Sequence, residues 1–133
     1  MSSQEKARIL VVDDDPAVQK LIMALLQRAD MEPTTALDAM QAAQILRKPP
    51  LPNAIVLDLM MPGISGMDFL KQMRSKDVFD HIPVVILSAI VDADQIREGL
   101  NSGADRYLTK PYLASNLVST LKDVLRTGRK KSS

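Results

Sequence analysis

Residues 54–63, Ala-Ile-Val-Leu-Asp-Leu-Met-Met-Pro-Gly, constrain the fold more than any other stretch of the chain. An apolar run that includes Ile55 and Val56 leads directly into Asp58, and Pro62-Gly63 follow shortly after. This pattern predicts a strand buried on both faces that ends in a turn, with a carboxylate at its carboxyl end. Because such a strand has no solvated face, Asp58 either forms the turn or carries the chemistry of the protein.

Four further strands and five helices are predicted along the rest of the chain. The strands are short apolar or β-branched runs, and the helices have apolar residues three or four positions apart. The predicted strands cover residues 9–12, 31–35, 54–57, 83–87 and 105–109, and the predicted helices cover residues 16–29, 38–47, 66–74, 92–101 and 113–125. For the second helix the pattern places Met40, Ala43 and Leu46 on the buried side. For the first helix the buried side includes Leu21.

Strict alternation of strands and helices predicts right-handed crossovers and a parallel sheet covered on both faces. Pro33 in the second strand removes a hydrogen-bond donor, and the last strand is polar, so both are expected at sheet edges. The expected fold is an α/β, flavodoxin-like doubly wound (βα)5 three-layer sandwich with strand order 2-1-3-4-5. In this fold a functional site lies at the carboxyl edge, here between the first and third strands.

The overall composition predicts one soluble, cytoplasmic domain. We expect a polar N-terminus over residues 1–7, the domain over residues 8–127, and a solvated tail or linker start over residues 128–133. A formal net charge of +1 points to no nucleic-acid partner, and the absence of cysteine excludes a disulfide framework. The N-terminus lacks the apolar core of a signal peptide, and no apolar run approaches the roughly 20 residues needed to cross a membrane.

The residues that could take part in a reaction follow the carboxyl ends of the predicted strands. These residues are Asp13 and Asp14, Asp58, Ser88 and Lys110. Converging carboxylates repel one another and need a cation, and an all-oxygen site suits Mg²⁺. A carboxylate beside a divalent cation, a lysine and a hydroxyl describes an aspartate that takes up a phosphoryl group. Taken singly, the aspartates at 13–15 are also compatible with helix capping, and Ser88 with an ordinary strand end.

These residues belong to longer motifs that resemble those of bacterial response-regulator receiver domains, over residues 7–127. The motifs are Ile9-Leu10-Val11-Val12-Asp13-Asp14-Asp15-Pro16, Asp58-Leu59-Met60-Met61-Pro62-Gly63-Ile64-Ser65-Gly66, Ser88-Ala89 and Lys110-Pro111. The resemblance implies that Asp58 is the phosphoacceptor. It also implies that Asp13, Asp14, Asp58 and the backbone carbonyl of Met60 hold Mg²⁺.

The resemblance also implies how the phosphoryl group is bound and sensed. Ser88, the backbone N–H of Ala89, and Lys110 would bind its oxygens, and the Lys110–Pro111 bond would be cis. Tyr107 would change rotamer when Ser88 moves, although an edge-strand tyrosine is also compatible with simple packing. The signal would reach the face formed by the fourth helix, fifth strand and fifth helix, through which two copies could pair.

The implied partners are a sensor histidine kinase or a phosphotransfer protein, with no membrane and no direct nucleic-acid binding. The domain would catalyse only its own phosphorylation and dephosphorylation. Met60 and Ile90 occupy positions that, in receivers, tune how water reaches the acyl phosphate. Both are apolar, so we expect a long-lived phosphorylated form.

The main alternative is a haloacid-dehalogenase-like aspartyl phosphatase. In that interpretation Asp13 is the nucleophile and Asp15 the general acid. It leaves Asp58 without a role, and Pro16 stands where that family usually has glycine. A flavodoxin-like electron carrier is disfavoured because three acids would repel a flavin phosphate, and a P-loop enzyme because the chain has no Gly-x-x-x-x-Gly-Lys motif.

Overall fold

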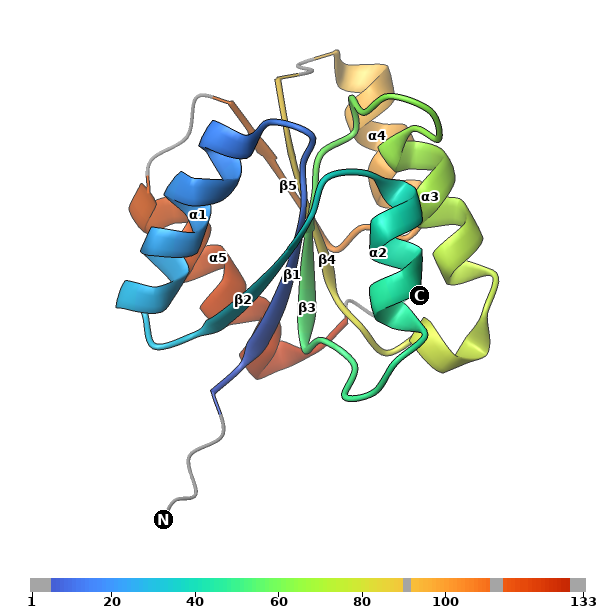
Figure 1. Ribbon diagram of the computed structural model, residues 1–133. Coiled ribbons are helices and arrows are strands. Elements are labelled where there is room, and N and C mark those ends of the chain that lie inside the picture. Colours follow the sequence, from blue (N-terminus) through green and yellow to red (C-terminus); the bar gives the residue numbers. More distant parts are fainter. Residues whose placement is uncertain (1–5, 90–91, 111–113, 130–133) are drawn as a thin grey trace.

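The computed structural model describes residues 6–89, 92–110 and 114–129, and a parallel five-stranded sheet of order β2-β1-β3-β4-β5 forms its centre (Figure 1). The strands are β1 (Arg8–Val12), β2 (Glu32–Ala36), β3 (Ala54–Leu57), β4 (Val84–Ser88) and β5 (Arg106–Thr109). The helices are α1 (Pro16–Arg28), α2 (Ala39–Leu46), α3 (Gly66–Arg74), α4 (Ala93–Asn101) and α5 (Ala114–Thr127), with a short 3₁₀ helix, η1 (Asp77–Phe79), after α3. The predicted fold class and strand order are confirmed.

The helices cover both faces of the sheet, α1 and α5 on one side and α2, α3 and α4 on the other (Figure 1). Alternate residues of each central strand point to opposite faces. Leu10, Ile55 and Ile86 therefore belong to one hydrophobic cluster, and Val11 and Val56 to the other. The three central strands are almost fully buried, because both of their faces are covered.

Side chains before the helices fix where they begin. Asp15 accepts a hydrogen bond from the N–H of Ala17, and Pro16 occupies the first helical position of α1. Ser65 caps α3 in the same way by accepting from the N–H of Asp68. Helices α1 and α3 consequently start directly after the loops that carry the candidate functional residues.

Strand register places those loops side by side. Val12 of β1 is paired with Leu57 of β3, and the N–H of Asp58 donates to the carbonyl of Val12 at 2.9 Å. Further along the same sheet, where β4 and β5 end, the N–H of Lys110 donates to the carbonyl of Ser88 at 2.8 Å. Residues from distant parts of the sequence therefore emerge together at the carboxyl edge.

Some details differ from the sequence-based expectations. The buried side of α2 carries Ala39, Ala42 and Leu46, whereas Met40 is exposed. Leu21 of α1 is exposed as well, because only a narrow stripe of that helix faces the sheet. The predictions for Ile90, Pro111 and Leu113 concern positions outside the described residues.

At the start of the expected solvated tail, Arg129 forms ion pairs with Asp80 and Asp105 of the domain. Within the described ranges, the structure contains no helix with the length and apolar character that crossing a membrane requires.

Candidate functional site

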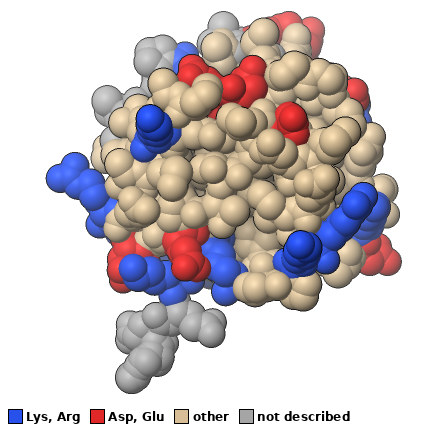
Figure 2. All heavy atoms as spheres, in the orientation of Figure 1, with Lys and Arg blue, Asp and Glu red and all other residues tan. Residues whose placement is uncertain are grey.

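Three carboxylates meet where β1 and β3 end. Oxygen atoms of Asp13, Asp14 and Asp58 all lie within 4.8 Å of one another. Asp13 and Asp58 are buried, and Asp14 is exposed. In Figure 2, acidic side chains gather at the upper edge of the molecule, above the carboxyl ends of the strands. An all-oxygen cluster of this kind matches the ligands that a hard divalent cation prefers.

Lys110 supplies the positive charge that this cluster requires. Its Nζ donates to Oδ2 of Asp13 at 3.1 Å and lies 3.6 Å from Oδ2 of Asp58. Burial alone would lower the pKa of Lys110. The hydrogen bond to Asp13 and the negative charges of Asp13 and Asp58 outweigh that effect, so the pKa is raised and the ammonium stays charged.

Asp58 is held at the centre of this arrangement. Its Oδ1 accepts a hydrogen bond from the N–H of Met60 at 3.1 Å, which leaves Oδ2 facing Lys110. Burial raises the pKa of Asp58, and the Met60 hydrogen bond and the charge of Lys110 only partly offset this rise. The charges of Asp13 and Asp14 raise it further. Ionising Asp58 therefore costs free energy unless a further positive charge binds beside it.

Ser88 and Tyr107 lie on neighbouring strands and contact each other. Ser88 is fully buried at the end of β4, and Tyr107 is half-buried on β5. Burial raises the pKa of the Tyr107 hydroxyl, and its hydrogen bond with Ser88 lowers it by less. Ala89, the next residue after Ser88, is exposed at the same edge. The structure thus links the predicted hydroxyl and the predicted aromatic residue directly.

Asp15 stands apart from the carboxylate cluster. It is exposed, and its Oδ1 accepts from the N–H of Ala17 at the start of α1. Oδ1 of Asp13 in turn accepts from the N–H of Asp15. The phosphatase interpretation needs Asp15 as a general acid beside Asp13, whereas here its carboxylate caps a helix.

Two residues position the site in ways that the sequence analysis did not predict. The amide of Gln19 is buried and donates to the carbonyls of Asp13 at 2.9 Å and Ala36 at 2.7 Å, so it joins the ends of β1 and β2. Gly66 lies so close to the backbone of Asp58 that an added Cβ would stand 2.1 Å from its carbonyl oxygen. Helical spacing to Ile22 places Gln19 on the buried side of α1, but its polar character concealed this in the sequence.

Removing the charge of Asp58 is expected to stabilise the metal-free protein. A folded-state pKa above the unfolded value gives stability at low pH that is lost as the pH rises through the folded pKa. At neutral pH, Asp58→Asn should therefore raise Tm by a few degrees, while Lys110 keeps Asp13 as a partner. Thermal unfolding in EDTA at several pH values tests this. The difference should shrink towards pH 4, and an equal difference at all pH values would contradict it.

Known proteins resemble this chain in sequence and in fold. A family model described as the response regulator receiver domain matches residues 9–122. The phosphate regulon transcriptional regulatory protein PhoB of Escherichia coli is 37% identical over 119 residues, which are 90% of this chain and 52% of PhoB. The DNA-binding response regulator MtrA of Mycolicibacterium smegmatis is 35% identical over 121 residues, 91% of this chain and 51% of MtrA. The chain thus spans about half the length of these relatives.

Solved structures agree with the sequence relatives. A putative response regulator from Chloroflexus aurantiacus superimposes with a TM-score of 0.86 at 31% identity, covering 92% of this chain and 99% of that one. The chemotaxis protein CheY4 of Vibrio cholerae gives 0.84 at 29% identity, with 90% and 99% covered. With the family model matching most of its length, the chain belongs to the response regulator receiver domains, the phosphorylation-controlled switches of two-component signal transduction.

Proposed function

We propose that Asp58 is the residue that receives the phosphoryl group, from a sensor histidine kinase or a phosphotransfer protein. The observation that carries this proposal is the position of Asp58 between two acids and Lys110 at the edge where β1 and β3 end. A carboxylate oxygen would form a bond to phosphorus, and the bond from phosphorus to the donor's leaving atom would break. The domain would catalyse only this transfer and the later hydrolysis of its own acyl phosphate.

The residues around Asp58 suit a Mg²⁺-dependent transfer. Asp13, Asp14, Asp58 and the backbone carbonyl of Met60 would hold Mg²⁺, which when bound neutralises charge on the phosphoryl oxygens. Lys110 would exchange its carboxylate partners for a phosphoryl oxygen. Since its pKa is raised, it would do so as a full positive charge.

Ser88 and Ala89 would bind the remaining phosphoryl oxygens through the hydroxyl and the backbone N–H. The new charge, about −1.5 to −2, would draw Ser88 towards Asp58. Because Tyr107 is hydrogen-bonded to Ser88, it would move in response and alter the face formed by α4, β5 and α5. That face would then control a partner, a second copy of the chain or an attached output segment, in the cytoplasm.

The proposal is tested by incubating the protein with acetyl phosphate and measuring its intact mass. With Mg²⁺ we expect one added phosphoryl group per chain, and with EDTA we expect almost none. A gain in mass that depends on Mg²⁺ distinguishes phosphoryl transfer catalysed at this site from slow chemical modification of surface groups. A protein that gains no phosphoryl mass with Mg²⁺ present would refute the proposal.

The phosphorylated form is expected to be long-lived. Met60 lies two residues after Asp58 with its side chain exposed beside the site, and its thioether cannot orient an attacking water. We expect a phosphoryl half-life of many minutes or longer, and Met60→Glu should shorten it by roughly tenfold, about 1.4 kcal/mol of barrier. Following the decay of intact phosphorylated mass after donor removal measures this. A half-life of seconds in the unmodified protein would contradict the expectation.

A further inference from the structure

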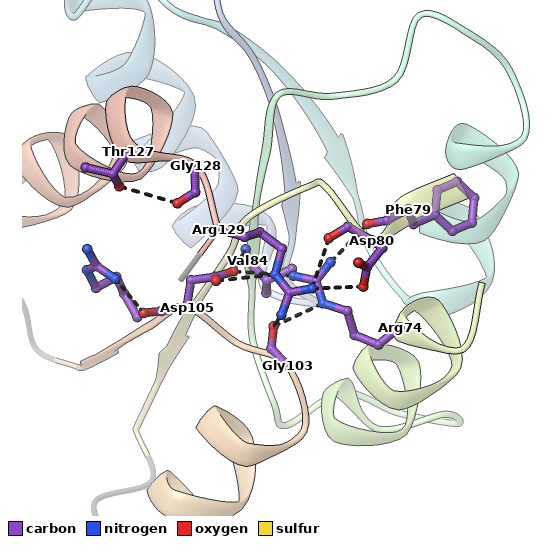
Figure 3. A network of polar contacts seen from close by, with 10 residues as sticks. Arg74, Phe79, Asp80, Val84, Gly103, Asp105, Thr127, Gly128 and Arg129 are labelled. Carbon is purple, nitrogen blue, oxygen red and sulfur yellow. Dashed lines mark hydrogen bonds and ion pairs between the residues drawn. The ribbon is translucent and has the colours of Figure 1, made fainter. Parts of the chain in front are cut away.

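A second polar cluster lies at the opposite edge of the sheet, where β4 and β5 begin (Figure 3). It joins the end of α3, the segment after η1, the turn before β5 and the second residue after α5. Its charged members are Arg74, Asp80, Asp105 and Arg129. None of these residues lies at the phosphorylation site, so the proposed function leaves the cluster unexplained.

Asp105 is the buried centre of the cluster. It is 3% exposed, and its Oδ2 accepts from the N–H of Val84 at 2.9 Å and from Arg74 at 3.3 Å. Arg74 also donates to the carbonyls of Phe79 and Gly103. Burial, together with the nearby charge of Arg129, lowers the pKa of Arg74 to about 10. Arg74 and Asp105 thus hold each other in place, and the other carboxylate oxygen of Asp105, Oδ1, faces Arg129.

All three side-chain nitrogens of Arg129 contact acceptors of this cluster. Nε lies 3.4 Å from Oδ1 of Asp105, and Nη2 donates to the carbonyl of Gly103 at 3.3 Å. Nη1 donates to the carbonyl of Asp80 at 2.9 Å and to its Oδ1 at 3.1 Å. Arg126, three residues earlier, is by contrast largely exposed, and among the described residues its ion pair is with Asp123, on its own helix.

The two arginines differ in how far their contacts can offset the cost of ordering the side chain. Fixing an arginine side chain costs conformational entropy, which one exposed ion pair does not offset. Arg129 meets acceptors from two separate segments, Asp80 after η1 and the turn before β5, and in that turn Asp105 is held in place by Arg74. The acceptors therefore form a prearranged site rather than a chance surface contact.

The backbone before Arg129 is shaped to deliver it. Gly128 has a φ of +74°, and its N–H donates to the carbonyl of Val124 at 2.8 Å, which closes α5. The chain therefore turns sharply after α5 instead of continuing along the helix axis. That turn brings Arg129 beneath the start of β5.

We propose that Asp80, Asp105 and the carbonyl of Gly103 form a docking site for Arg129 that fixes where the chain leaves the domain. The last described residue, Arg129, is thereby held at the amino edge of the sheet, opposite the carboxylate cluster. The docked turn also borders a hollow of about 630 Å³ that Tyr107 lines from β5. The departure point is therefore adjacent to the face that, if the proposed function is right, responds to phosphorylation.

The docking is tested by amide hydrogen exchange of Gly128 in Arg129→Gln and in the matched control Arg126→Gln. Both variants lose one positive charge near the end of α5. We expect Arg129→Gln to accelerate Gly128 exchange roughly tenfold and Arg126→Gln to change it little, because only the first releases the turn. Exchange of Val11 in β1, one of the buried strands, should be the same in all variants, which shows that the fold is intact.

A second variant keeps the test independent of how Arg129→Gln folds. The Asp80 side chain is exposed, so Asp80→Asn removes, at the surface, the negative charge that pairs with Arg129. It should also accelerate Gly128 exchange, and the double variant should fall short of the sum of the two effects. Unchanged exchange in both single variants, or equal acceleration by Arg126→Gln, would overturn the proposal.

The departure point is tested with a spin label. Because the chain has no cysteine, Ser132→Cys creates a single labelling position. The label should broaden amide signals of Asp80 and Gly103 at the amino edge and leave Asp14 and Ala89 at the carboxyl edge sharp. Arg129→Gln should weaken that broadening. Equal broadening with and without Arg129 would show that Arg129 does not set the departure point, whatever the outcome of phosphorylation experiments.

Discussion

Replacing Asp58 with asparagine is expected to abolish phosphoryl uptake from acetyl phosphate. Asparagine keeps the size of the side chain and an oxygen for the N–H of Met60, so the loop should retain its shape. Its amide is not a nucleophile of comparable strength, and the acyl phosphate cannot form. We therefore expect an intact mass without an added phosphoryl group under conditions that phosphorylate the unmodified protein.

Asp15→Asn is the matched control for this loss. The same chemical change is then made at an exposed aspartate that lies outside the carboxylate cluster and caps α1. Asparagine is an equally good cap, so stability should hardly change and phosphoryl uptake should be retained. The control also separates the receiver mechanism from a phosphatase that uses Asp15 as its acid.

The two mechanisms predict opposite patterns for the pair of variants. If Asp58→Asn still gains phosphoryl mass and Asp15→Asn turns over poorly, the nucleophile is not Asp58 and Asp13 becomes the candidate. If neither variant affects uptake, the modified residue is neither Asp58 nor Asp15. Peptide mapping of the trapped phosphoryl group in the unmodified protein would identify the residue in either case.

The sheet could be predicted from the sequence because its strands are buried on both faces. Runs such as those around Val11 and Val56 contain no polar residue that could face water, and the helices between them fix parallel pairing. Details at partly exposed surfaces could not be predicted in this way. Met40 is hydrophobic yet exposed, since hydrophobic character alone does not decide which side of a short helix meets the sheet.

The carboxylate cluster was also predictable, because each member directly follows a predicted strand and parallel strands end at the same edge. The contacts of Gln19 and Arg129 were not. Both are polar residues whose partners are backbone carbonyls or acids from distant segments. A single sequence records no partner for such groups, and only the folded arrangement brings them together.

Gly66 is expected to be the least replaceable glycine of the chain. At the first position of α3, alanine would ordinarily improve helix stability by up to about 1 kcal/mol. Here a Cβ would lie 2.1 Å from the carbonyl oxygen of Asp58 and 2.7 Å from Cα of Leu59, both backbone atoms that no side-chain rotation can move. Gly66→Ala should therefore destabilise the fold by about 1–3 kcal/mol.

Phosphoryl uptake should fall as well, since relieving the clash displaces Asp58, the proposed phosphoacceptor. Gly63→Ala is the matched control for Gly66→Ala. Gly63 lies in the same loop with a φ of +75°, and a Cβ there would meet nothing within 4 Å. Its replacement should cost about 1 kcal/mol from the left-handed backbone alone, with uptake largely retained. Denaturant unfolding and phosphorylation rates measured on both variants separate the two effects. If Gly66→Ala were as stable as the unmodified protein, helix propensity would outweigh the contact, and Gly66 would not hold Asp58 in place.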